Sequence, residues 1–142
     1  MLNKALDIAY KAHWGQTDKA GAPYKLHLTR VALHCQTEDE KIVALLHDVV
    51  EDTPITLEEL KVQGFSDDVL AALKCLTKIK GEDYQIFIQR VATNPLAVKV
   101  KIQDLKDNMD LSRLGGKPHW KMETYKEALI YLAQCLEKSE CK

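Results

Sequence analysis

The residues between positions 44 and 52 combine an apolar stretch with groups that could do chemistry. His47-Asp48 and Glu51-Asp52 interrupt a run of Ala, Leu and Val that has the character of a buried helix. In a continuous helix His47 and Glu51 lie one turn apart, as do Asp48 and Asp52, so the side chains can converge. A metal ion would satisfy such a cluster. The alternative is that the acids form a solvated helix end and that His47 is a hydrogen-bonded core histidine.

The stretch 98–109 offers a second set of polar groups beside an apolar helix face. Asp104 and Asn108 lie one turn apart next to that face and could point into a polar cleft, although a single aspartate on a helix is most often solvated. His27 follows a loop that contains Gly and Pro. A lone histidine near a helix start is more often structural than a ligand, so neither group is decisive alone.

Taken together, these stretches supply two imidazoles and two carboxylates. The four residues are His27, His47, Asp48 and Asp104. Such a set suits a borderline-to-hard divalent ion such as Mn²⁺, Fe²⁺ or Zn²⁺ with positions left open for water, whereas a closed structural zinc site favours cysteine. The set therefore predicts a metal site, and its order, H…HD…D, resembles the HD-domain pattern.

The elements that must position these residues are predicted to be all α-helical. Apolar residues recur at steps of three and four, and no stretch alternates in the manner of a strand. Two sequences, Thr37–Glu40 and Thr56–Glu59, match a capping box, and Gly, Pro and Ser place the other helix ends. The expected helices span about 2–12, 26–34, 38–52, 57–63, 67–77, 83–92, 95–114 and 117–137.

Composition narrows the class of protein. The chain has 142 residues, of which 46% are apolar and 29% charged, as in a soluble globular protein of one domain. Its 20 Lys and Arg against 21 Asp and Glu give a formal charge of -1, so no long-range attraction to nucleic acid or anionic membrane is expected. The longest apolar run, Ala128–Ala133, is too short to cross a bilayer, and no secretory signal is recognisable. We expect a cytoplasmic protein with neither kind of partner.

Four stretches of the chain are similar to those of a known family. They are Ala12–Gln16, Gly21–His27, Ala44–Thr53 and Lys101–Met109. The chain resembles the hydrolase domain of the RelA/SpoT family and its stand-alone relatives, the small alarmone hydrolases. The element HDxxEDT at 47–53 is more specific than a bare HD pair. The resemblance implies a single compact all-α HD domain over 1–142, with no synthetase or regulatory domain.

The resemblance also implies an activity. A Mn²⁺-dependent enzyme, with another divalent ion as the alternative, would remove the 3′-diphosphate of ppGpp or pppGpp and release pyrophosphate with GDP or GTP. His27, His47, Asp48 and Asp104 would hold the metal. In the family the acidic pair after the HD motif orients or activates the attacking water, a role that would fall to Glu51 and Asp52. Asn108 would line the nucleotide pocket.

Three cations are candidates to meet the charge of the substrate. The resemblance places Lys19 near the substrate, and Lys101 and Arg113 could neutralise phosphate charge. For each of them the alternative is an ordinary solvated cation.

The sequence departs from the family pattern at three positions. Asp18 stands where alarmone hydrolases commonly carry Arg, Leu28 replaces the usual Pro, and Asp107 replaces an aromatic residue or His. An acid at position 18 would weaken the attraction for a highly anionic nucleotide. Two alternatives therefore stay open: an HD phosphohydrolase acting on another nucleotide or phosphorylated metabolite, and a non-catalytic nucleotide-binding regulatory module.

Overall fold

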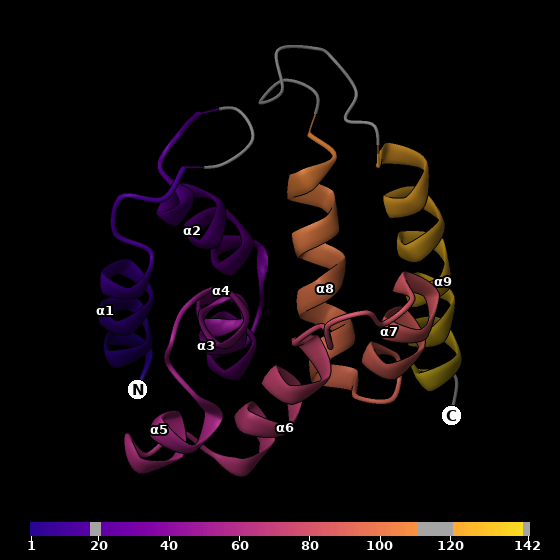
Figure 1. The fold of residues 1–142 in the computed structure, drawn as a ribbon. Helices are drawn as coiled ribbons and strands as arrows, with labels where there is room; N and C mark the ends of the chain where they lie inside the picture. Colours follow the sequence, from indigo (N-terminus) through magenta and orange to yellow (C-terminus); the bar gives the residue numbers. More distant parts are fainter. Residues whose placement is uncertain (18–20, 111–120, 141–142) are drawn as a thin grey trace.

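The computed structural model describes residues 1–17, 21–110 and 121–140. Within these ranges the chain forms nine α-helices and no strand, apart from an isolated bridge between Thr17 and Pro23 (Figure 1). The helices are α1 (Leu2–Ala12), α2 (Tyr24–His34), α3 (Glu38–Leu46), α4 (Val49–Asp52), α5 (Leu57–Val62), α6 (Asp67–Leu76), α7 (Tyr84–Val91), α8 (Pro95–Asn108) and α9 (Met122–Glu140). The predicted all-α class is confirmed.

Side-chain caps begin several helices where the sequence predicts them. At α3 the Thr37 hydroxyl accepts a hydrogen bond from the Glu40 N–H at 3.1 Å, and the Glu40 carboxylate accepts from the Thr37 N–H at 3.2 Å. This reciprocal box also explains why the Glu40 carboxylate is buried. Thr56 and Ser66 accept in the same way at the starts of α5 and α6. Each cap satisfies a backbone donor that the helix itself leaves unpaired.

The predicted helix over 38–52 is interrupted at the residues expected to do chemistry. His47 and Asp48 form a turn between α3 and α4, so the prediction of one continuous helix is wrong. The His47 Nδ1–H donates to the Ala44 carbonyl at 2.6 Å, and in a continuous helix that carbonyl would accept from the Asp48 N–H. The Asp48 carbonyl still accepts from the Asp52 N–H at 2.9 Å, so one helical turn joins these two acids.

The predicted helix over 95–114 is shorter than expected. α8 ends at Asn108, and the next residue leaves the helix with φ −96° and ψ 4°. Apolar spacing cannot distinguish the end of a helix from apolar residues that follow it, which explains the error. The last helix, predicted from about Lys117, begins at Met122, and residues 111–120 lie outside the described ranges.

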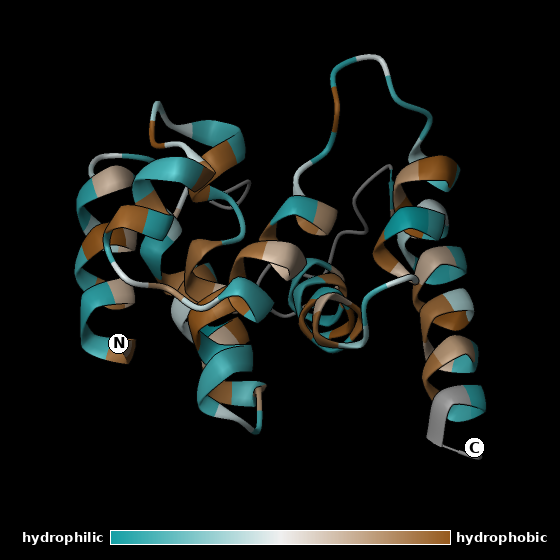
Figure 2. Cartoon of the chain, turned by 90° about the horizontal axis from the view of Figure 1, so that it is seen from below, coloured by the Kyte–Doolittle hydropathy of each residue, from teal (hydrophilic) through white to brown (hydrophobic). Residues whose placement is uncertain are grey.

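Helix α8 occupies the centre of the fold. It packs against α2, α3, α6, α7 and α9 (Figure 1), while α1 and α2 cover α3. The hydrophobic residues of α9 lie mainly on its side turned toward the rest of the chain (Figure 2). The resulting core is mainly aliphatic, with buried side chains such as Leu45, Leu73, Leu105 and Leu132. This packing fixes α8 against α2 and α3 and so brings together the candidate metal ligands, which lie on α2, directly after α3, and on α8.

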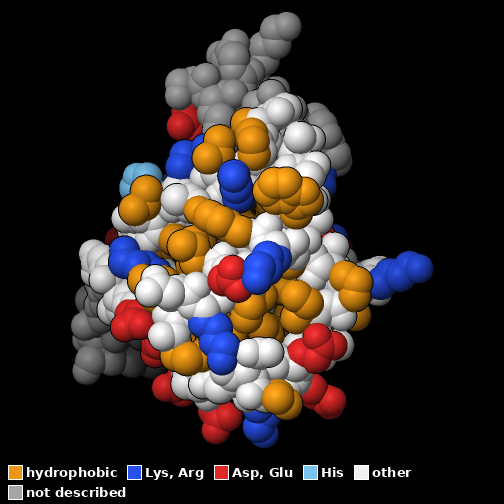
Figure 3. Space-filling model, turned by 90° about the vertical axis from the view of Figure 1, so that its left-hand side faces the viewer, with side chains coloured by type: hydrophobic (Ala, Val, Ile, Leu, Met, Phe, Trp, Pro, Cys, Tyr) orange, Lys and Arg blue, Asp and Glu red, His pale blue; other side chains and the backbone are white. Residues whose placement is uncertain are grey.

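The surface agrees with the near balance of charge. On the face shown in Figure 3, basic and acidic side chains are interspersed among hydrophobic ones. Among the helices that the structure describes, none has the length and apolar character that a membrane span requires. Among the described residues, Cys35, Cys75 and Cys135 are free thiols.

Candidate metal centre

Three of the four predicted metal ligands meet in the interior of the described fold. His27 comes from α2, His47 from the turn after α3, and Asp104 from α8. His27 Nε2 lies 2.9 Å and His47 Nε2 3.3 Å from the same oxygen, Asp104 Oδ1, and all three side chains are at most 5% exposed. One donor atom from each residue lies within 4.8 Å of the others. That spacing allows all three to coordinate one ion.

The surroundings of His47 Nε2 suit metal coordination better than hydrogen bonding. The Nδ1–H group of this ring donates a hydrogen bond to the Ala44 carbonyl. Nε2 lies near two carboxylate oxygens but makes no hydrogen bond of acceptable geometry, although it is fully buried. A buried polar atom without a partner is costly. A cation between the imidazoles and the carboxylates would satisfy it, so the donor set fits a divalent ion with N and O ligands.

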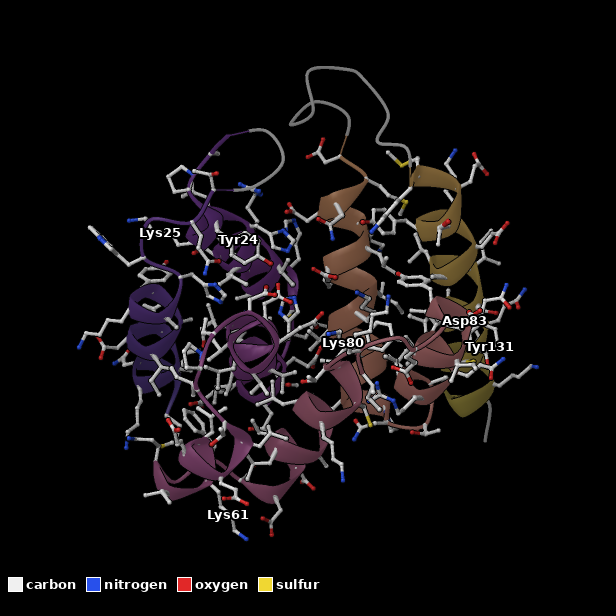
Figure 4. The ribbon with its side chains drawn as sticks, in the orientation of Figure 1. Tyr24, Lys25, Lys61, Lys80, Asp83 and Tyr131 are labelled. Atoms are coloured by element: carbon white, nitrogen blue, oxygen red, sulfur yellow. The ribbon has the colours of Figure 1, made fainter. Side chains whose placement is uncertain are left out.

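The fourth predicted ligand, Asp48, lies beside the other three. Its Oδ2 atom is 3.1 Å from His47 Nε2 and also accepts a hydrogen bond from the Tyr24 hydroxyl. Tyr24, labelled in Figure 4, stands at the beginning of α2, one turn before His27. Sequence reasoning did not assign Tyr24 a role, although its position one turn before a ligand on the same helix was a usable signal.

Opposite charges control the ionisation of the buried groups. Burial alone would raise the pKa of Asp104, but the Lys101 ammonium and the two imidazoles hold it well below its usual range. Burial likewise opposes ionisation of Asp48, yet the neighbouring His47 lowers its pKa to about 2. Burial would lower the pKa values of His27 and His47, but the facing carboxylates raise both above the ordinary value. The metal-free cluster is therefore a network of charged partners.

Lys101 takes part in this network as well as facing the cavity. Its Nζ atom lies 2.9 Å from Asp104 Oδ2, and the side chain is only 14% exposed. The ammonium also lies 5.4 Å from the centre of the Phe87 ring. The nearby Asp104 charge raises the pKa of Lys101 despite its burial, so this side chain stays protonated.

A cavity of about 670 Å³ opens onto the cluster, a volume in the range of small-molecule sites. Of the residues assigned a catalytic or substrate-binding role from the sequence, Glu51, Lys101 and Asn108 line this cavity, whereas Asp52 is absent from the described lining. Lys78 and Lys121 add cations that sequence reasoning did not single out. The predicted cations Lys19 and Arg113 lie outside the described residues.

Glu51 and Asp52, the acidic pair after the HD motif, have different positions relative to the cavity. Burial raises the pKa of Glu51, aided by the charges of Asp48 and Asp52, although the Lys78 N–H donates to Glu51 Oε2 at 3.4 Å. Burial and the Asp48 charge also raise the pKa of Asp52. Of the two, Glu51 is the acid that lines the cavity.

A second carboxylate of α8, that of Asp107, binds His27 Nδ1, the outer nitrogen of the ring, which does not face Asp104. Asp107 Oδ2 lies 2.5 Å from His27 Nδ1, and Arg30 binds the same carboxylate through Nε at 2.8 Å and Nη2 at 3.2 Å. Burial opposes the charge of Asp107, but the bonds from His27 and Arg30 lower its pKa to about 2. Sequence reasoning noted Asp107 only as a departure from a family pattern and did not consider Arg30.

Comparison with known sequences gives several relatives, although no protein-family model matches the chain. Guanosine-3′,5′-bis(diphosphate) 3′-pyrophosphohydrolase of Aquifex aeolicus is 32% identical over 120 residues, which cover 76% of this chain and 17% of that protein. The protein of that name from Borreliella burgdorferi is 40% identical over 80 residues, covering 54% and 12%. The bifunctional (p)ppGpp synthase/hydrolase SpoT of Escherichia coli is 30% identical over 125 residues, covering 76% and 17%. The chain thus spans less than a fifth of the length of these relatives.

The fold is also similar to a solved structure of a metazoan ortholog of SpoT that hydrolyses ppGpp. The two chains superpose with a TM-score of 0.73, and the match covers 96% of this chain and 92% of the other. Their sequence identity is 24%, so this likeness establishes the shared helical architecture.

Proposed function

We propose a function from the premise that this chain is a RelA/SpoT-type HD domain: it hydrolyses the 3′-diphosphate of guanosine 3′,5′-bis(diphosphate) or its pentaphosphate analogue. Water attacks the phosphorus bonded to the ribose 3′ oxygen, that P–O bond breaks, and the 3′ oxygen takes up a proton. The products are pyrophosphate and GDP or GTP. The curated relatives carry this activity in their names, which supports the choice of substrate class.

One observation carries the proposal of a metal-dependent hydrolase. The buried donors of His27, His47 and Asp104 converge, and His47 Nε2 has no hydrogen-bond partner although it is fully buried. With Asp48 beside them, these residues would hold a divalent metal, for which we propose Mn²⁺. Bound there, the metal would act as a Lewis acid, lowering the pKa of water and polarising the phosphoryl group.

We assign Glu51 as the general base that accepts the proton of the attacking water. Its carboxylate lines the same cavity as the ligands, and burial raises its pKa toward the range that a general base needs. Asp52 does not line that cavity, but its N–H bonds to the Asp48 carbonyl. That backbone bond holds the turn that carries Asp48 and does not involve the Asp52 side chain, so the proposal of Asp52 as a second acid at the attacking water rests on the family resemblance.

We assign nucleotide binding to the cations and the amide that line the cavity. Lys78, Lys101 and Lys121 bring positive charge to the lining, which suits a substrate with two diphosphate groups. The Asn108 amide, one turn beyond Asp104 on α8, offers both a donor and an acceptor to the base or sugar. Tyr84 and Tyr125 contribute aromatic surface to the same lining.

The experiment that tests this function is pyrophosphate release from ppGpp in Mn²⁺ and again after chelation, with dGTP and GDP as parallel substrates. Manganese-dependent release from ppGpp alone is the expected result. Turnover of another nucleotide in place of ppGpp would move the chain to a different HD phosphohydrolase activity. Metal binding without turnover of any substrate would instead support a nucleotide-binding regulatory module.

A further inference from the structure

We propose that Asp107, held by Arg30, is a positioning residue that sets the His27 ring for metal binding. This role rests on the proposed function, because it takes His27 to be a metal ligand. Asp107 does not line the cavity and touches the metal cluster through the outer nitrogen of His27. It therefore acts through another residue and is not itself a catalytic group.

The geometry places the His27 ring between two carboxylates of the same helix. Asp104 Oδ1 lies 2.9 Å from Nε2, and Asp107 Oδ2 lies 2.5 Å from Nδ1. The two acids are three residues apart on α8, so they project from neighbouring positions on one side of the helix. With the ring only 4% exposed, both of its polar edges are fixed by α8.

The Asp107 carboxylate, held by Arg30, determines which nitrogen of His27 carries the proton when a metal is bound. Arg30 donates hydrogen bonds to this carboxylate through Nε and Nη2, and a carboxylate held in this way accepts a further hydrogen bond and does not donate one. Nδ1 must then be the donor, which leaves Nε2 with its lone pair toward Asp104 and His47. A carboxylate bonded behind a metal-binding histidine orients the ring and raises its basicity as a ligand.

The two histidines of the cluster are supported in different ways. His47 donates its Nδ1 proton to the neutral backbone carbonyl of Ala44, whereas His27 donates to a charged side chain. Only the support of His27 can be removed by substitution. The carboxylate that supports His27 also comes from another helix: His27 and Arg30 lie on α2, whereas Asp107 lies on α8.

A matched control exists elsewhere in the fold. Arg90 binds Glu82 through Nε and Nη2, at 3.3 Å and 2.8 Å. The side-chain exposures are 26% and 9% for Arg90 and Glu82, against 31% and 10% for Arg30 and Asp107. Neither Arg90 nor Glu82 lines the cavity of the metal cluster. Glu82→Gln therefore removes a comparable ion pair without touching a proposed ligand.

The test is a titration of the metal-free protein with Mn²⁺, in which electron paramagnetic resonance measures the concentration of the free ion at each step. Asp107→Asn should weaken Mn²⁺ binding about 10- to 100-fold, the usual loss when the support of a metal-binding histidine is removed. Arg30→Gln should weaken it by a smaller factor, because Asp107 remains. Glu82→Gln should bind as wild type does. Thermal unfolding of all four metal-free proteins shows whether each variant is folded.

A second readout follows the proton itself. In wild-type protein loaded with Zn²⁺, the His27 Nδ1–H should give a downfield NMR resonance protected from solvent exchange, and Asp107→Asn should shift it or expose it to exchange. Unchanged Mn²⁺ affinity in Asp107→Asn, or an equal loss in Glu82→Gln, overturns the positioning role and leaves the hydrolase function standing. Wild-type protein that binds Mn²⁺ but releases no pyrophosphate from ppGpp overturns the proposed function instead, while the titration still decides the role of Asp107.

Discussion

Lys101 Nζ lies 2.9 Å from Asp104 Oδ2, while the other oxygen of the same carboxylate faces both histidines of the cluster. One carboxylate thus joins the proposed metal site to a cation at the wall of the cavity. Because Lys101 is almost buried and stays protonated, its charge acts on Asp104 at short range and with little screening by solvent.

Replacing Lys101 should therefore change metal binding and stability in opposite directions. In Lys101→Met the cation that competes for Asp104 is gone, so Mn²⁺ should bind more tightly. Without metal, Asp104 loses a charged partner in the interior, and the free energy of unfolding should fall by about 1–3 kcal/mol. Calorimetric Mn²⁺ titration and urea denaturation with a chelator measure the two effects. Lys99→Met, on the exposed side of α8, is the control and should change neither quantity.

Asp48 and Glu51 should separate metal binding from catalysis. Asp48→Ala removes a carboxylate next to His47 Nε2, so it should abolish metal-dependent turnover together with most of the Mn²⁺ affinity. Glu51→Gln should leave the metal bound and slow turnover by about 10²-fold or more, the usual effect of losing a positioned proton acceptor. Full activity in either variant would contradict the assignment.

Tyr24 should contribute to metal binding through Asp48. Its hydroxyl donates to Asp48 Oδ2, and a hydrogen bond to a charged group is worth about 1.5–3 kcal/mol. Unlike the Lys101 ammonium, this hydroxyl is neutral, so it orients the Asp48 carboxylate without competing with a cation for its charge. We expect Tyr24→Phe to weaken Mn²⁺ binding by about tenfold or more. Tyr10→Phe is the matched control, because the Tyr10 hydroxyl bonds to Thr29, which lies outside the lining of the metal cavity. Equal Mn²⁺ affinities for the two variants would show that the Tyr24 hydroxyl does not support the site.

Cys35 should resist alkylation in the folded protein. Burial raises the pKa of this thiol to about 11, and its Sγ–H donates to the Val31 carbonyl at 3.3 Å. Near pH 8.5 the reactive thiolate is therefore scarce in the folded state, whereas the unfolded chain ionises in the ordinary range. Ionisation thus favours the unfolded chain once the pH exceeds that ordinary range, and stability should fall as the pH rises toward 11. Iodoacetamide labelling with peptide mapping should modify Cys75 and Cys135, which are less buried, before Cys35.

Much of this site could be predicted from residue types and spacing. The capping pattern at Thr37 specified where α3 begins, and the order of histidines and aspartates selected the residues that cluster. The break after α3 was not predictable in this way, because it depends on a side chain, His47, bonding to a backbone carbonyl of its own helix. Periodicity records which face of a helix is apolar and contains no information on such a bond.

Asp107 and Arg30 show a second limit of sequence reasoning. Each looks like an ordinary surface charge of a helix, and their positions are 77 residues apart in the chain. Only the packing of α2 against α8 brings them together, behind a histidine that the sequence had already singled out. A pair of this kind becomes recognisable once the partners of every buried polar atom are known.

The convergence of α2, the turn after α3, and α8 on one point has a consequence for how long the protein survives in a cell. The donors of His27, His47 and Asp104 come together only in the folded chain, so a metal held by them would bind the native state in preference to the unfolded one. At a free metal concentration 100 times the dissociation constant, such binding adds about 2.7 kcal/mol to stability. Metal supply would then set the fraction of molecules open to proteases, so starvation for metal would lower the abundance of the protein as well as its activity.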